Sequence, residues 1–200
     1  MIIALIKKQI SADKSTVDFS IVLSSGEKEE KKKLTLLYED ACEFSFDIPC
    51  NITKEEYTDL LYYGERYSAL MAAFRILEYG DNSTASLKKK LRMKGISSDA
   101  ADFAVEKAEE MGYIDDASLL REDILRAANG KLYGKRRIFA EMMSKGYKRE
   151  DISAALEILE GEIDYAENKK QLILRKYGEK RPESAEEAAK IKAFLYRYGY

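Results

Sequence analysis

The hydrophobic pattern of the chain changes its period near residue 53. Before this point apolar and polar side chains alternate, most clearly at Val17, Phe19 and Ile21, and this is the period of a strand with one buried face. We therefore expect three or four antiparallel strands. The charged run over residues 27–33 is typical of a solvated loop or a strand end. The alternating segments are residues 1–10, 17–23, 34–38 and 44–48.

From residue 53 onward the apolar positions follow a helical period. Thr53 and Glu56 form a capping box, in which each side chain bonds the other residue's backbone N–H, so a helix begins here. We expect short helices of about three turns each. Most should end at a glycine, which tolerates the left-handed backbone conformation beyond a helix. These glycines are at positions 64, 80, 95, 112, 130, 134, 146, 161 and 178.

Three segments of the helical half share one internal motif. Each has two apolar residues four positions apart, a glycine four positions later, and then another hydrophobe. Since residues four apart share a helix face, each motif predicts a helix with an apolar edge that glycine ends. The motifs cover residues 87–96, 138–147 and 191–200.

The spacing of these motifs predicts the domain organisation. One helix precedes each motif and another follows the first two, so each repeat should be a three-helix bundle stacked on its neighbours. The fold class is thus mainly α, with three tandem three-helix repeats, the last truncated, and a small antiparallel β-rich N-terminal segment. The expected parts are a β-rich segment 1–52, a connecting helix 53–66, repeats 67–116 and 117–164, and a partial repeat 165–200.

Composition argues against an enzyme. The chain has no histidine, which removes the commonest general base and zinc ligand, and Cys42 and Cys50 match no metal or redox motif. We expect both cysteines to be reduced, small buried groups in a cytoplasmic protein, against a disulfide or a reactive thiol. Asp115 and Asp116 precede a helix, where capping explains them better than catalysis. No catalytic residue, metal, cofactor or membrane span is predicted.

Basic side chains are the candidate functional groups. Residues 1–66 carry nine Lys and Arg against thirteen Asp and Glu, whereas residues 167–200 carry nine against five. Such asymmetry suggests a partner with its own charge pattern, although each single side chain could simply be solvated. The basic residues at or before each motif are Lys88, Lys89, Lys90, Arg92 and Lys94; Lys131, Lys135, Arg136 and Arg137; and Arg175, Lys176, Lys180 and Arg181.

The order of these signals resembles the RecX family, regulators of the recombinase RecA. The resemblance covers residues 67–200 well and residues 1–66 in outline. Three departures are Lys135, where a proline is common, the missing last helix of the third repeat, and an N-terminal segment that is more strand-like and acidic than in many relatives. The segments that carry the resemblance are ALMAAFRILEY at 69–79, SLKKKLRMKGI at 86–96, GYIDD at 112–116, GKLYGKRRI at 130–138 and MMSKGY at 142–147.

The resemblance implies a non-catalytic regulator that binds within the groove of the RecA–DNA filament and restrains strand exchange and ATP hydrolysis. This would be a role in DNA recombination, DNA repair and the SOS response. We expect a monomer whose basic side chains reach the recombinase and the phosphate backbone of DNA. The alternatives are a helical module that binds DNA directly, since its helices have the length of a helix-turn-helix, and a helical scaffold for an unrelated protein. The tyrosines could stack on bases, but those after helix-ending glycines are expected to pack against the helix end.

Overall fold

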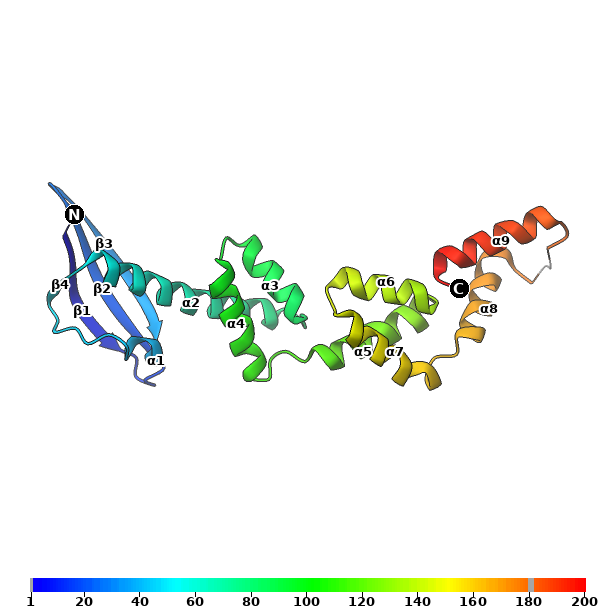
Figure 1. The fold of residues 1–200 in the computed structure, drawn as a ribbon, viewed down its shortest axis with the longest axis horizontal. Helices are drawn as coiled ribbons and strands as arrows, with labels where there is room; N and C mark the ends of the chain where they lie inside the picture. Colours follow the sequence, from blue (N-terminus) through cyan, green and yellow to red (C-terminus); the bar gives the residue numbers. More distant parts are fainter. Residues whose placement is uncertain (1, 180–181) are drawn as a thin grey trace. The chain divides into compact units, whose positions relative to one another are not determined.

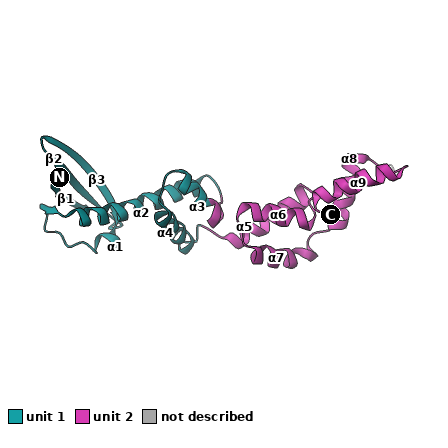
Figure 2. Ribbon diagram, turned by 45° about the horizontal axis from the view of Figure 1, so that its top comes forward, with its two compact units in different colours: residues 1–80, 87–113 teal, residues 81–86, 114–200 magenta. Residues whose placement is uncertain are grey.

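The computed structural model describes residues 2–179 and 182–200 (Figure 1). It divides into two compact units (Figure 2). Unit 1 comprises residues 1–80 and 87–113, and unit 2 comprises residues 81–86 and 114–200. The strands all belong to unit 1, whereas helices occur in both, so the protein is mainly helical with one small sheet.

Unit 1 begins with an antiparallel sheet in the strand order β3-β2-β1-β4. Its hydrophobic face carries Phe19 and Ile21 from β2, one of the two inner strands. Neither side chain has any exposed surface, as the alternating pattern predicts. Leu60 from the following helix joins this core. The strands are β1 (Ile2–Ile10), β2 (Thr16–Ser25), β3 (Lys28–Leu37) and β4 (Cys50–Ile52), with the short helix α1 (Tyr38–Ala41) after β3.

The charged run lies at a strand end, one of its two expected places, because its residues from Lys28 onward begin β3 and pair with β2 from Ser25 backwards. One local expectation about the sheet is wrong. The segment 44–48 is not a strand. Its alternation arises because Phe44 and Phe46 stack with their ring centroids 5.6 Å apart and pack together on the sheet core. Alternating apolar residues can therefore face the core together without their backbone hydrogen bonding to a neighbouring strand.

The long helix α2 (Lys54–Glu78) connects the sheet to the helical layer of unit 1. The capping box at its start is confirmed, with the Glu56 amide 3.1 Å from Thr53 Oγ1 and the Thr53 amide 2.7 Å from a Glu56 carboxylate oxygen. The expected break at Gly64 is wrong, since the helix continues through it. Gly64 is buried and faces Leu34 of β3.

Two further helices follow: α3 (Thr84–Met93), whose residues from Leu87 onward belong to unit 1, and α4 (Ser98–Glu110). The Ser97 side chain caps α4, whose buried alanines pack on α2. Arg66 of α2 links the layers, because its guanidinium lies 3.8 Å from the centre of the Phe103 ring and 3.3 Å from the Asp40 carboxylate. Burial raises the pKa of that carboxyl group, and Arg66 opposes the rise.

The described residues of unit 2 form helices joined by short connections. Its main core joins Ile124, Ile138 and Ile152, each from a different helix and each without exposed surface. The buried Asp123 accepts a hydrogen bond from Tyr147 and an ion pair from Lys145, so this polar group is satisfied within the core. The elements are α5 (Asp116–Leu125), a π-helical turn (Arg126–Gly130), α6 (Lys135–Lys145), α7 (Arg149–Ile158) and a 3₁₀ turn (Leu159–Gly161).

A second, smaller core of unit 2 involves α8 (Tyr165–Tyr177) and α9 (Ala185–Tyr198). Phe194 of α9 packs with Leu172 of α8 and with Leu132, which precedes α6. The end of α9 interlocks with the start of α6, where the Gly134 amide donates to the Tyr198 carbonyl at 2.7 Å. A β-carbon on Gly134 would lie only 2.5 Å from the Gly199 carbonyl oxygen, so this approach requires glycine.

The glycine motifs share one local geometry. Gly95, Gly146 and Gly199 all have positive φ, at 84°, 94° and 94°. The amide of the residue after each glycine donates to the carbonyl five positions earlier, on Leu91, Met142 and Leu195. This is the hydrogen bond of a glycine-ended helix, so the expected caps are confirmed at all three motifs.

Candidate functional site

The basic residues of α3 point away from a buried apolar edge. Leu87 and Leu91 have no exposed surface, which leaves the lysines and arginines between and after them on the outside. Lys88 is half-buried and pairs with Asp102 of α4, and Arg92 donates to the Ser98 hydroxyl. Lys89, Lys90 and Lys94 are exposed. Lys89 and Lys94 make no ion pair with any residue that the structure describes.

The basic residues before and in the first turn of α6 are exposed but already paired. Lys131 lies 2.6 Å from the Glu141 carboxylate, whose hydrogen bond raises the pKa of that lysine. Lys135 pairs with Glu160 and also lies over the Tyr165 ring, 5.5 Å from its centre. Cations at a helix N-terminus oppose the helix dipole, and these partners offset that cost.

The two arginines of this turn contact different parts of unit 2: Arg136 contacts the end of α9, and Arg137 contacts the segment before α6. The Arg136 guanidinium donates to the Tyr200 carbonyl at 2.6 Å and lies 4.5 Å from the centre of the Tyr196 ring. Arg137 lies 5.3 Å from the centre of the Tyr133 ring. Within unit 2, the structure thus gathers Lys131, Lys135, Arg136 and Arg137 around one helix start, and gives each an intramolecular contact.

The third predicted set lies at the end of α8. Arg175 and Lys176 are both exposed, and the Lys176 ammonium lies 4.0 Å from the centre of the Phe194 ring. Lys180 and Arg181 fall outside the described residues. The α3 set belongs to unit 1 and the other two sets belong to unit 2.

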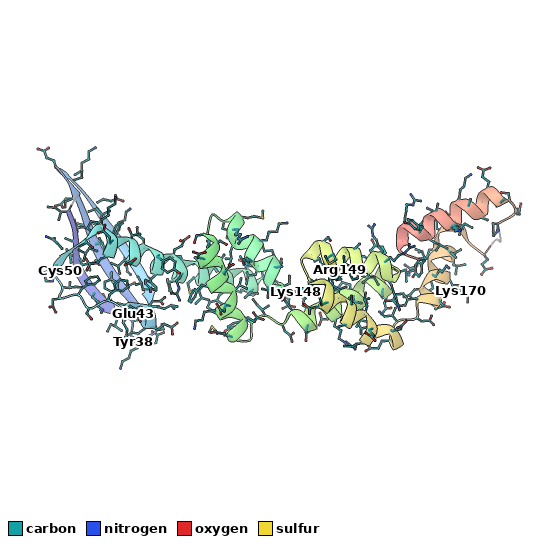
Figure 3. All side chains as sticks on the ribbon, viewed as in Figure 1. Tyr38, Glu43, Cys50, Lys148, Arg149 and Lys170 are labelled. Carbon is teal, nitrogen blue, oxygen red and sulfur yellow. The ribbon has the colours of Figure 1, made fainter. Side chains whose placement is uncertain are left out.

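Other basic residues are exposed without having been singled out from the sequence. Lys148, Arg149 and Lys170 are the clearest examples (Figure 3). They lie outside the three basic clusters predicted from the sequence. The only sequence signal for them was the general increase in positive charge toward residue 200. Lys170 approaches Glu167 at 3.7 Å with its side chain 79% exposed, which leaves it accessible to a partner.

The polar groups that could suggest catalysis have structural roles. Asp115 caps α5 by accepting from the Ser118 amide at 2.9 Å, as predicted, and this hydrogen bond lowers the pKa of the carboxyl group. Asp116 accepts from the Thr84 amide. Cys50 is partly buried and both cysteines are free, but Cys42 is exposed, contrary to the expectation that it is buried.

Neither a metal cluster nor a membrane span was found over residues 2–179 and 182–200. No group of three or more acidic or cysteine side chains there could hold a metal ion. No helix there combines the length and the apolar composition that crossing a bilayer requires.

The tyrosines after the glycine caps differ from one another. Tyr147 is buried and donates to Asp123, whereas Tyr113 is 59% exposed beside Phe74.

Comparison with known proteins gives a consistent set of relatives. The protein named "Regulatory protein RecX" from Caldanaerobacter subterraneus subsp. tengcongensis is 32% identical over 149 residues, which are 74% of this chain and 73% of the relative. The protein of the same name from Xanthomonas axonopodis pv. citri is 35% identical over 128 residues, 64% of this chain and 77% of the relative. No family model matches.

Two solved structures have a fold similar to that of this chain. A crystal structure described as regulatory protein RecX superposes with a TM-score of 0.73 over 99% of this chain and 94% of its own, at 17% identity. The structure of RecX from Lactobacillus salivarius gives a TM-score of 0.58 over 68% of this chain and 88% of its own, at 19% identity.

Proposed function

Because this chain belongs to the RecX family of regulatory proteins, we propose that it regulates RecA by binding the RecA–DNA filament and inhibiting ATP hydrolysis and strand exchange. Its role would lie in DNA recombination and repair. The observation that carries this proposal is the exposed basic surface of α3, above all Lys89 and Lys94, together with the basic groups of α6 and α8.

We propose that these basic groups recur because residues 67–116, 117–164 and 165–200 are tandem three-helix repeats, the last one truncated. The shared positive φ and the shared hydrogen bond to the carbonyl five positions earlier at the Gly95, Gly146 and Gly199 motifs support this division. A nucleoprotein filament also repeats its protein surface and its phosphates. A protein with repeated contact points then gains from linked binding, since each contact raises the effective concentration of the next.

The intramolecular partners of the α6 set do not prevent such binding. The Lys135–Glu160 pair is exposed on both sides, with side chains 45% and 64% accessible. An exposed pair of this kind contributes only about 0–1 kcal/mol, so a phosphate can replace the glutamate at little cost. Phosphate contacts also release counterions, and binding should weaken steeply as salt is raised.

The proposal is tested by assaying RecA from the same organism with and without this protein. We expect inhibition of both the DNA-dependent ATPase and strand exchange at submicromolar protein, weakening as salt increases. An unchanged ATPase rate and unchanged strand exchange at saturating protein would show that the chain does not regulate RecA.

A charge-reversal variant tests the basic surface itself. The double variant Lys89→Glu/Lys94→Glu should weaken inhibition about tenfold or more while leaving the fold intact, because neither side chain is paired within the described residues. Lys31→Glu/Lys54→Glu is the matched control, since it makes the same change in net charge at exposed positions of β3 and α2. Equal inhibition by the two variants would refute the assignment of this surface.

Two outcomes would favour the other functions. Strong binding to one duplex sequence without RecA would indicate a direct DNA-binding module. Failure to bind either RecA filaments or DNA would indicate a helical scaffold for an unrelated protein. In both cases the membership of the RecX family would stand, but the proposed activity would not.

A further inference from the structure

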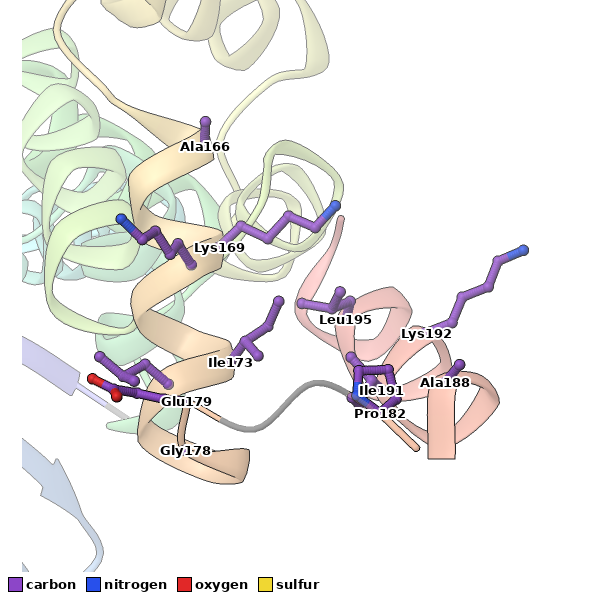
Figure 4. A pocket seen from close by; sticks show the side chains of 12 residues that line it. Ala166, Lys169, Ile173, Gly178, Glu179, Pro182, Ala188, Ile191, Lys192 and Leu195 are labelled. Carbon is purple, nitrogen blue, oxygen red and sulfur yellow. The ribbon is translucent and has the colours of Figure 1, made fainter. Parts of the chain in front are cut away.

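Helices α8 and α9 leave an open, mostly apolar groove between them (Figure 4). Its volume is about 880 Å³. Ile173 of α8 faces Leu195 of α9 across the groove, and Ile191 lies one turn before Leu195. All three side chains are only half-buried, although residues of this type are usually enclosed.

The neighbouring bundle of unit 2 shows what fills a groove of this kind. There α7 lies against α5 and α6, and its residues Ile152 and Leu156 join the core with Ile138. Helix α9 carries the same motif as α6, with Ile191 at the position of Ile138. Ile138 has no exposed surface, whereas Ile191 remains half-buried, because no third helix among the described residues covers α8 and α9.

The rim of the groove carries positive charge. Lys169 and Lys192, one on each helix, line it and are exposed. Neither of them forms an ion pair with the residues described for this chain, although Lys170 beside them approaches Glu167. Lys169 extends from α8 toward α9 (Figure 4). Among the described residues that line the groove, Glu179 is the one acidic side chain.

We propose that this groove binds one amphipathic helix of a partner protein, with aliphatic side chains on its inner face and carboxylates on its flank. The aliphatic face would cover Ile173, Ile191 and Leu195, as α7 covers the core of its own bundle. The carboxylates would pair with Lys169 and Lys192. Helix binding in a groove of this kind uses apolar side chains at positions i, i+3, i+4 and i+7. This inference does not depend on any effect on RecA.

The test measures binding of the full chain to a fluorescent synthetic helix, by anisotropy at low salt. The probe carries leucines at i, i+3, i+4 and i+7 and glutamates on one flank; one control has lysines in place of the glutamates, and another has a scrambled order. We expect saturable binding of the acidic probe, at least about tenfold tighter than either control. Equal binding of the scrambled peptide, or no saturable binding, overturns the proposal.

Substitutions in the protein locate the binding surface. Ile191→Gln should weaken the acidic probe about tenfold, whereas Ile158→Gln, at a 74% exposed isoleucine of α7, should leave binding unchanged. Lys169→Glu/Lys192→Glu should reverse the preference, so that the lysine probe binds tighter, and these exposed residues can change without unfolding the bundle. An unchanged preference refutes the charge assignment.

Sedimentation of the chain alone distinguishes a partner helix from a second copy. We expect a single species whose mass does not depend on concentration. A dimer that Ile191→Gln dissociates would mean that a second copy occupies the groove, and the proposed partner would be wrong.

Discussion

The interlock between Gly134 and Gly199 makes a sharp prediction about the attachment of α9. In Gly134→Ala the new β-carbon would lie 2.5 Å from the Gly199 carbonyl oxygen and 2.6 Å from its carbon. Both are backbone atoms, so no side chain can rotate out of the way. Gly134 has φ −79°, which alanine adopts freely, so any loss of stability must come from the clash rather than from backbone strain.

The magnitude follows from two losses. Overpacking a close contact costs about 1–3 kcal/mol. Moving α9 away also lengthens the 2.7 Å hydrogen bond from the Gly134 amide to the Tyr198 carbonyl, a loss of about 0.5–1.5 kcal/mol. We expect a total of about 2–4 kcal/mol. Because α9 can detach while the core around Ile138 stays intact, the penalty should fall on α9 alone.

Amide hydrogen exchange measures this local penalty. In Gly134→Ala the amides of residues 194–198 should exchange about 30-fold faster or more, while those of residues 152–156 in α7 keep their rates. Gly130→Ala is the matched control, since a β-carbon there meets nothing within 4 Å. If α9 exchanges at the same rate in both variants, the interlock does not hold this helix and the reasoning is refuted.

Three further predictions concern unit stability. Arg66→Met should lower the free energy of unfolding by about 3–5 kcal/mol in urea titrations, because it leaves the buried Asp40 carboxylate without its counter-ion, and adding Asp40→Asn should restore part of the loss. Thr53→Ala should cost about 1 kcal/mol by removing the cap of α2, whereas Thr53→Ser should not. Burial raises the pKa of Tyr200 from 10.0 to about 12, so its contribution to stability is complete below pH 10 and is lost as pH rises to 12. Between pH 10 and 12 the urea midpoint of Tyr200→Phe should therefore fall less than that of the unsubstituted protein. The same fall in both proteins would contradict the prediction.

Much of the fold could be predicted from local patterns. The strand at Val17–Leu23, the capping box and the three glycine-ended helices depend on side chains near in sequence, and the structure contains all of them. Gly64 shows where such patterns fail. Glycine lowers helix propensity by about 1 kcal/mol, but α2 continues through Gly64, which is buried and faces Leu34, thirty positions earlier in the chain. A contact at that separation leaves no local signal.

The candidate site was less predictable than the fold. The sequence located the basic residues but could not indicate which of them have partners. Lys135 and Glu160 are far apart in the chain and form an ion pair, whereas Lys89 and Lys94 make none within the described residues. The groove between α8 and α9 was equally hidden, because an apolar stripe looks the same in sequence whether or not another helix covers it.

The continuity of α2 has a mechanical consequence for unit 1. This uninterrupted helix of 25 residues is about 37 Å long, and it packs on the sheet near its beginning and on α4 near its end. Because one continuous helix joins both contacts, we expect that a tilt of the β-strands also displaces α4.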